Sequence, residues 1–177
     1  MRKDAEERRT RLIAIAAELF AEQGYGVPLE TVAERAGVGR GTLYRNFADR
    51  NAMILAVIET RLAELERFAR DNCSSADMIR GFIRCLGGVG AFHETALVGS
   101  REIHFEIVRQ LRARVDDLLE FVLGCANAAG SVRPGLAPDD LRMINRMLVA
   151  ATADPEIDRE RALDKALDII MTGLKKA

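Results

Sequence analysis

Residues 28–47 read PLETVAERAGVGRGTLYRNF, and their pattern predicts two short helices joined by a tight turn. Gly37 permits the turn because glycine adopts backbone conformations that other residues avoid. Ala33 in the first helix is small enough to let a second helix cross closely, and Leu43 anchors that second helix. This order of elements is that of a helix-turn-helix. The stretch therefore predicts a second helix whose N-terminal end can enter the major groove of DNA.

The second predicted helix, residues 40–47, carries hydrogen-bonding side chains that its apolar residues leave facing outward. Arg40 can make a bidentate contact with guanine, and Thr42 can offer its methyl group to thymine or its hydroxyl to a phosphate. Tyr44 and Asn46 can donate hydrogen bonds to phosphates. The alternative interpretation is that this is an arginine-rich amphipathic helix with a solvated outer face.

Glycine residues crowd the start of the same helix, although each glycine inside a helix costs about 0.5–1 kcal/mol relative to alanine. Gly39 and Gly41 remove side-chain bulk, so that the backbone can approach a phosphate or a base edge. A helix N-terminus also presents free N–H groups and a partial positive charge to an anion. The glycines therefore favour close contact with DNA at a cost in helix stability.

The rest of the chain shows helical periodicity and no convincing alternating strand, which predicts an all-α fold. Gly24 is expected to end the first helix as a left-handed cap, Pro28 to lie in the first turn of the second helix, and Asp49 to be an N-cap. A loop is predicted over residues 130–138, GSVRPGLAP. The expected helices cover residues 8–23, 28–36, 40–47, 50–70, 76–92 (capped by Ser74 or Ser75) and 94–98. After a break at Gly99 and Ser100, a long helix is expected to end near residue 129, followed by helices over residues 139–153 and 155–175.

Composition limits the protein classes further. The net charge is -1, and only residues 37–50 are clearly basic, so any DNA contact would use a small surface. No run approaches the roughly 18 consecutive apolar residues that would span a bilayer, and the charged start MRKDAEERRTR is unlike a signal peptide. We therefore expect a cytoplasmic protein without membrane contact. The odd number of widely spaced cysteines favours reduced, structural thiols over disulfides or zinc ligands.

Catalysis is not predicted, because the sequence contains no nucleophile elbow, phosphate loop, HExxH or paired-carboxylate motif. His93 and His104 have no assignable catalytic partner. On a helix, Glu102 and Glu106 share a face that His104 leaves, so no metal site is expected. No cofactor is predicted.

Residues 8–58 as a whole resemble the N-terminal domain of tetracycline-repressor (TetR) family regulators. The resemblance is carried by the helix AAELFAEQGY, the block VAERAGVGRGTLYRNF, and the apolar start of a fourth helix after a short polar link. It implies a three-helix DNA-binding domain over residues 1–50 and a helical effector-binding and dimerisation domain over residues 51–177.

The resemblance further implies a homodimer whose C-terminal helices pack as a four-helix bundle and whose body holds a pocket for a small-molecule effector. Arg40, Gly41 and Thr42 would lie at the bases and Tyr44 and Asn46 at phosphates. Arg50 stands where the family usually carries a lysine that binds the DNA backbone. The expected DNA-binding residues are Gly39, Arg40, Gly41, Thr42, Tyr44, Asn46 and Arg50.

Apolar and aromatic residues at helical spacing supply the candidates for the other two sites. The ligand-binding candidates are Phe82, Cys85, Phe92, His104, Phe105 and Val108, for which an ordinary core is the alternative. The dimer-interface candidates are Met143, Ile144, Met147, Leu163, Leu167, Ile170 and Met171.

The function expected from these features is a dimeric transcriptional regulator that binds near-palindromic operator DNA as a repressor and is released by a small-molecule effector. Two alternatives remain open. One is a DNA-binding dimer without a small effector, controlled by a protein partner, and the other is an activator.

Overall fold

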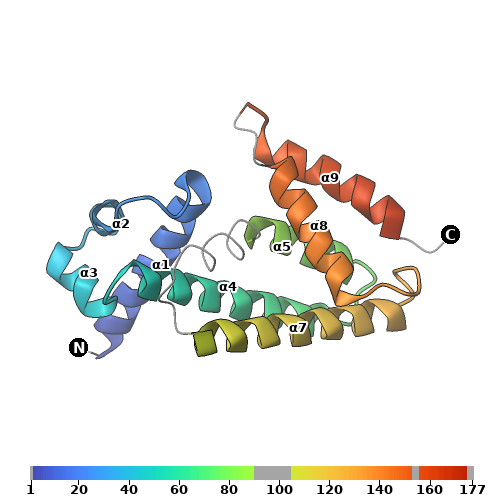
Figure 1. Ribbon diagram of the computed structural model, residues 1–177, viewed down its shortest axis with the longest axis horizontal. Coiled ribbons are helices and arrows are strands. Elements are labelled where there is room, and N and C mark those ends of the chain that lie inside the picture. The colour runs from blue at the N-terminus through green and yellow to red at the C-terminus, as the bar shows by residue number, and fades with distance from the viewer. Residues whose placement is uncertain (1, 90–104, 153–155, 175–177) are drawn as a thin grey trace. The chain divides into compact units, whose positions relative to one another are not determined.

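The fold is all-α, as the sequence predicts. The computed structural model describes residues 2–89, 105–152 and 156–174, and within these ranges the chain forms eight helices and no strand (Figure 1). The helices are α1 (Arg2–Gln23), α2 (Leu29–Arg35), α3 (Arg40–Asn46), α4 (Arg50–Asn72), α5 (Met78–Val89), α7 (Phe105–Ala128), α8 (Pro138–Ala151) and α9 (Arg159–Leu174). The helix expected over residues 94–98 lies outside the described residues.

The described residues form two compact units. The division falls inside α4, between Arg61 and Leu62, so that one continuous helix contributes to both units. The first unit holds α1 to α3 and the beginning of α4, and the second holds the rest of α4 with α5 and α7 to α9. The domain boundary expected after residue 50 stays a prediction.

The first unit is built on side chains that are completely or almost completely buried. Leu12, Ala16, Leu19 and Phe20 repeat at the helical spacing on α1, which gives that helix one apolar stripe. The rest of the unit contributes further buried side chains, which include Val32, Leu43, Phe47, Met53 and Val57. These apolar contacts hold the short helices α2 and α3, since helices of seven residues are not stable alone.

Local capping signals fix two helix ends in this unit. Gly24 has φ +78° and donates its N–H to the Phe20 carbonyl at 3.0 Å, which confirms the left-handed cap. The Asp49 carboxylate accepts a hydrogen bond from the Ala52 N–H at 2.8 Å, which confirms it as the N-cap of α4. Each of these ends depends on residues within one helical turn.

Three predicted helix starts are wrong. α1 begins at Arg2, not residue 8, because its polar first turns contain no breaker and carry favourable i,i+4 pairs such as Glu7 and Arg11. Pro28, with ψ 139°, stands before α2 as its N-cap residue, not in its first turn. α5 begins at Met78, not residue 76, although the Ser75 hydroxyl accepts the Asp77 N–H at 3.3 Å, in keeping with the expected cap.

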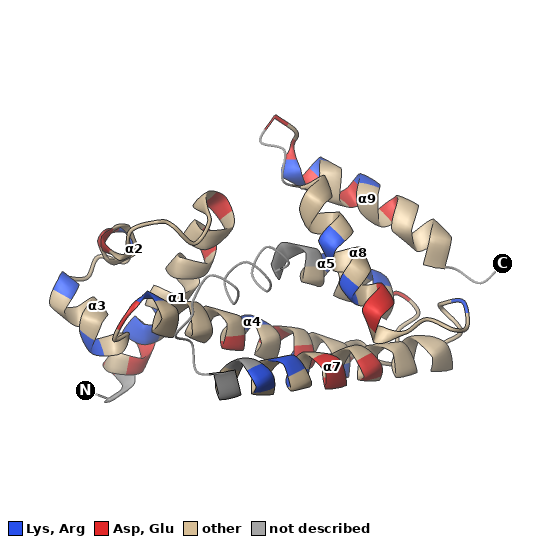
Figure 2. Cartoon of the chain, in the orientation of Figure 1, with Lys and Arg blue, Asp and Glu red and all other residues tan. Residues whose placement is uncertain are grey.

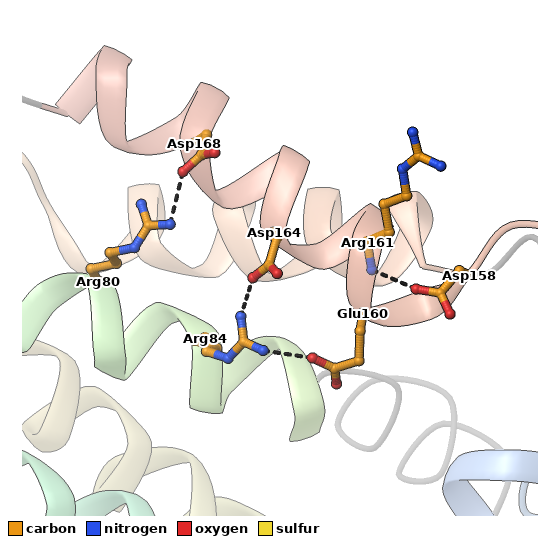
Figure 3. Close-up of polar contacts among 7 residues, drawn as sticks. All are labelled: Arg80, Arg84, Asp158, Glu160, Arg161, Asp164 and Asp168. Carbon is orange, nitrogen blue, oxygen red and sulfur yellow. Dashed lines mark hydrogen bonds and ion pairs between the residues drawn. The ribbon is translucent and has the colours of Figure 1, made fainter.

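In the second unit, α5, α8 and α9 pack on one another and α7 packs against α5 and α8. Its buried residues include Met78, Phe82, Ile83, Leu119, Val122, Leu141, Leu148, Leu163 and Leu167. Arginines of α5 also reach carboxylates of α9: Arg80 lies 2.7 Å from Asp168, and Arg84 lies 2.5 Å from Glu160 and contacts Asp164 (Figure 3). The groups are about half exposed, so these ion pairs align two helices that apolar burial holds together.

A disulfide joins Cys73, the residue after α4, to Cys125 in α7, with their Cα atoms 5.2 Å apart. The expectation of three reduced thiols is therefore wrong for this pair. The two cysteines are separated by 52 residues, and sequence spacing cannot show that the fold brings them together. Cys85 is the free cysteine and is exposed.

Candidate nucleic-acid interface

The turn between α2 and α3 is held by backbone hydrogen bonds that close the C-terminal end of α2. Gly37 has φ +67° and donates its N–H to the Glu34 carbonyl, while the Val38 N–H reaches the Ala33 carbonyl, both at 3.0 Å. This pair of bonds is a Schellman motif, which requires a left-handed residue at the position of Gly37. The turn that the sequence predicts is therefore formed, and it fixes the direction in which α3 leaves α2.

We expect Gly37→Ala to lower the free energy of unfolding by about 1–2 kcal/mol, because a side chain in the left-handed region costs about that much. A Cβ at Gly37 would meet no atom within 4 Å, so backbone strain alone accounts for the loss. Urea unfolding followed by circular dichroism measures it.

Gly41→Ala is the matched control for this prediction. Gly41 is exposed, does not have a positive φ, and lies in α3, where alanine is the better helix former. This variant should be as stable as the parent or more stable. Equal losses in the two variants would contradict the importance of the left-handed turn.

Two contacts hold α3 from its inner side and from its C-terminal end. Leu43 is fully buried, which fixes the inner face of the helix. At the C-terminal end, the Arg9 guanidinium of α1 donates to the Asn46 carbonyl at 3.0 Å and lies 4.5 Å from the centre of the Phe47 ring. An arginine at this position satisfies a carbonyl that the helix leaves open and complements the negative end of the helix dipole. Sequence reasoning missed Arg9, because its partner lies 37 residues away.

A small charged cluster lies at the N-terminal end of α3. The Arg40 guanidinium is 3.4 Å from the Glu30 carboxylate and 5.5 Å from the centre of the Tyr44 ring, and its side chain is 73% exposed. The Tyr44 hydroxyl donates to the same Glu30 carboxylate at 3.4 Å. Glu30 in α2 therefore orients two of the predicted DNA-binding side chains, and the sequence pattern gave no sign of this role.

The remaining predicted side chains of α3 make local contacts. Asn46 donates its side-chain amide to the Thr42 carbonyl at 2.8 Å, so this amide is engaged within the helix. The Thr42 hydroxyl accepts a hydrogen bond from Arg45 at 3.1 Å. Of this group, Arg45 is exposed and the other two are half-buried. The exposed cations of α3 are thus Arg40 near its start and Arg45 near its end.

The glycines at the start of α3 are not required by packing within the chain. A Cβ at Gly39 or Gly41 would meet no atom within 4 Å, and neither glycine has a positive φ. Gly39 is the N-cap residue, in extended conformation, and its carbonyl accepts the Thr42 and Leu43 N–H groups. No side chain at Gly39 or Gly41 therefore covers the backbone in the first turn of α3, where the helix dipole has its positive end.

Arg50 does not stand free at the surface. One guanidinium nitrogen donates to the carbonyls of Tyr25 and Val27, both at 2.6 Å, and the residue is half-buried. These carbonyls belong to the loop between α1 and α2, so Arg50 ties the first residue of α4 to that loop. In this arrangement it braces the helix-turn-helix, and a phosphate contact from the same nitrogen would have to replace both bonds.

The charges of the first unit are mixed. Figure 2 shows basic residues on α3 and toward the N-terminal end of α1, with acidic residues on α1 and α2 among them. Arg8, Arg9 and Arg11 of α1 are exposed, and Arg35 of α2 pairs with Glu22 of α1 at 3.3 Å. The basic surface is therefore small, in keeping with the single basic segment that the sequence shows.

The candidate ligand-binding residues are only partly within the described residues. Phe82 is fully buried in α5, whereas Cys85, one turn further on, is exposed, so the two side chains have different surroundings. Desolvation raises the pKa of the Cys85 thiol against the opposing effect of Arg84. Phe92 and His104 lie outside the described residues, as do the side chains of Phe105 and Val108. No group of three or more metal-ligating side chains occurs within the described ranges.

The candidate dimer residues fall into two groups. Leu167 is fully buried within the single chain, and Ile144, Leu163 and Met171 are 7–8% exposed. Leu167 is therefore covered by its own chain, and its assignment to an interface stays a prediction. Met143 and Met147, one turn apart on α8, are 52% and 53% exposed, and Ile170 is intermediate. Ile169 of α9, which the sequence reasoning did not select, is 66% exposed.

No described helix is long and apolar enough to cross a membrane. Residues 12–57 match the family described as bacterial regulatory proteins, tetR family. The curated HTH-type transcriptional regulators SAUSA300_2515 and SAR2658 of Staphylococcus aureus are each 43% identical to the chain over 63 residues, which is 35% of this chain. The match spans 34% of each relative, about a third of its length.

Solved structures extend the similarity over nearly the whole chain. A TetR transcription regulatory protein from Mycobacterium vanbaalenii is 28% identical, with 99% of each chain covered and a TM-score of 0.70. The TetR transcriptional regulator SCO0520 from Streptomyces coelicolor is 24% identical. The match covers 96% of this chain and 99% of the SCO0520 chain, with a TM-score of 0.69. A gamma-butyrolactone receptor described as ArpA-like is 21% identical, with 98% and 91% covered and a TM-score of 0.61.

Proposed function

The chain belongs to the TetR family, and we propose that it is a transcriptional regulator that binds a near-palindromic operator as a homodimer and represses transcription until a small molecule releases it. The observation that carries the operator contact is the exposed first turn of α3. There Arg40 is 73% exposed beside two glycines whose Cβ positions are open. A helix N-terminus with this composition suits a base edge flanked by phosphates.

Selection of bound sequences from random duplex DNA at a stated salt concentration tests the proposal, because phosphate contacts make affinity salt-dependent. An enriched palindrome with half-sites about 34–36 Å apart is the expected result, since a two-fold dimer presents two recognition helices to successive major grooves. Folded protein that enriches no sequence, with or without added metabolites, would contradict the operator proposal.

Arg40→Ala should weaken operator binding by about 1–3 kcal/mol and relax the base preference at one position of each half-site. The reason is that an arginine bound to the O6 and N7 atoms of guanine distinguishes that base from the other three. Affinities for the selected operator and for its single-base variants, measured by fluorescence anisotropy, check this.

Arg45→Ala is the matched control, because Arg45 is an exposed arginine on the same helix that lies outside the predicted DNA-binding set. It should lower affinity for all duplexes alike, and by less. A uniform loss in Arg40→Ala as well would make Arg40 a phosphate contact and remove its role in base reading.

The proposed homodimer uses the exposed apolar residues of α8 and α9. Met143 and Met147 lie on one face of α8, because residues four apart are neighbours on a helix. Ile169 adds an exposed apolar side chain on α9, the helix that packs against α8. Methionine and isoleucine at this exposure favour burial against a second copy.

Met147→Glu should convert the dimer to a monomer at micromolar concentration, since each interface would bury two uncompensated carboxylates. Light scattering after size-exclusion chromatography gives the mass. Glu156, already acidic and exposed, offers a control through Glu156→Gln, which should leave the mass unchanged. A dimer that survives Met147→Glu with unchanged dissociation would move the interface elsewhere.

Release by a small molecule is the part of the proposal that rests on the fold. The fold is shared with a protein described as a gamma-butyrolactone receptor. A metabolite panel followed by thermal unfolding tests for an effector, because a ligand that binds only the folded state raises stability by RT ln(1 + [L]/Kd). A stabilising compound that leaves operator affinity unchanged would contradict effector release, because linkage requires the two effects to be coupled.

A further inference from the structure

The disulfide between Cys73 and Cys125 stands at one end of the helix that both units share. Cys73 directly follows Asn72, the last residue of α4, and is half-buried, whereas Cys125 in α7 is 6% exposed. Their Cα atoms lie 5.2 Å apart. The bond therefore joins the C-terminal end of α4 to α7, and Cys73 is the less buried residue of the pair.

A second contact lies along the same two helices. The Glu66 carboxylate of α4 accepts two hydrogen bonds from Arg114 of α7, at 2.9 and 3.1 Å, and Glu66 is 20% exposed. The two contacts follow one another in the same order on both helices, so this half of α4 runs parallel to α7 (Figure 1). The disulfide is the covalent member of the pair, and its loss would leave a charged contact that is partly open to water.

At its other end α4 is tied to the helix-turn-helix. Arg50, its first residue, donates to the carbonyls of Tyr25 and Val27 in the loop that precedes α2. α4, a helix of 23 residues, therefore has a bond at each of its ends, one in each unit. The disulfide lies next to the last residue of α4, and Arg50 is the first residue of the same helix.

We propose that Cys73 and Cys125 form a reversible thiol–disulfide exchange site, and that the oxidised form binds operator DNA more tightly than the reduced form. This rests on the proposed function as an operator-binding regulator. A protein that acts on bacterial DNA works where thiols are kept reduced, and disulfides in such surroundings are mostly transient, catalytic or redox-sensing. The reagent is a cellular thiol of the glutathione or thioredoxin class.

The exchange proceeds in two balanced steps. A reagent thiolate attacks Sγ of Cys73, the more exposed residue of the pair, and Cys125 leaves as a thiolate that takes up a proton. A second reagent thiolate attacks the reagent sulfur of this mixed disulfide, and Cys73 leaves and is protonated. Two protein thiols and one reagent disulfide result. Two electrons pass to the protein, and a reagent disulfide reverses the process.

The direction of the effect follows from conformational freedom. With the bond intact, the C-terminal end of α4 has one position on α7. DNA binding then costs less conformational entropy, because the protein is already ordered at this point. After reduction the same end samples more positions, and some of these misplace the loop that Arg50 contacts. We expect at least fivefold tighter operator binding by the oxidised protein. By linkage, saturating operator must favour the disulfide over the two thiols by the same factor.

The experiment uses the full chain in glutathione buffers of defined ratio. Operator affinity is measured by fluorescence anisotropy on fully oxidised and fully reduced protein. The disulfide fraction is measured by alkylation and mass spectrometry, with and without operator. A fivefold affinity difference together with an equal shift of the glutathione equilibrium is the expected result. Equal affinities, or tighter binding by the reduced protein, would overturn the proposal.

Two variants and one measurement separate this role from simple stabilisation. Cys73→Ser should bind operator like the reduced parent in every buffer. Cys85→Ser, at the exposed cysteine outside the bond, should keep the full redox response. Circular dichroism of the same samples shows whether the reduced protein is folded, and a difference in affinity that only reflects unfolding would count against the proposal. If neither form selects a DNA sequence, the proposed function fails, whereas the glutathione equilibrium still reports on the bond itself.

Discussion

Reduction of the Cys73–Cys125 disulfide should lower the free energy of unfolding by about 4 kcal/mol. The bond closes a loop across a sequence separation of 52 residues, and the chain-entropy relation assigns about that value to a loop of this length. Urea unfolding by circular dichroism, with and without a phosphine reductant, measures the difference. This loss of stability is expected for the single chain and does not depend on DNA.

The Cys85→Ser variant is the control for this first prediction. Its cysteine is exposed and outside the bond, so the substitution should change stability by less than about 0.5 kcal/mol and leave the effect of the reductant intact. Identical unfolding curves for the oxidised and reduced protein would show that the second unit does not depend on the bond for its stability.

Leu167→Ala should destabilise the chain by about 2–5 kcal/mol, the usual cost of removing a large side chain from a packed core. Leu167 is fully buried, on the face of α9 that packs within the single chain. The same unfolding experiment measures the loss, and light scattering follows the mass of the variant under folding conditions.

Ile169→Ala is the matched control, because Ile169 lies on the same helix and is 66% exposed. Its effect on the stability of the single chain should stay within about 0.5 kcal/mol. If Leu167→Ala changed the mass without changing stability, Leu167 would be an interface residue after all, and the helices would have to pack differently from the arrangement described above.

Features that depend on neighbouring residues could be predicted from the sequence. Gly24 and Gly37 end their helices in the left-handed conformation, and Asp49 caps α4, because each needs only partners within a turn or two. The helix-turn-helix follows for the same reason, since its spacing of small and apolar residues is contained within 20 residues.

Features that depend on distant partners could not be predicted. The periodicity of α8 and α9 marks apolar faces, but it does not tell which face the chain itself covers, so Leu167 and Met147 looked equivalent. Arg9 reaches Asn46, and Cys73 reaches Cys125, across 37 and 52 residues. The direction in which Arg50 turns, toward two loop carbonyls, is likewise decided by tertiary packing.

The carboxylate of Glu30 bears on how quickly a regulator of this kind finds its site. In the free protein Glu30 holds both Arg40 and Tyr44, so a random stretch of duplex must compete with an internal anion before it can engage either side chain. Weak attachment to random sequence shortens each unproductive encounter and leaves the protein free to slide or hop onward. If Arg40 reads a base as proposed, a base that accepts both of its hydrogen bonds would displace Glu30 and lengthen the encounter. Under the proposed function, Glu30 would therefore favour attachment to the operator over attachment to random sequence.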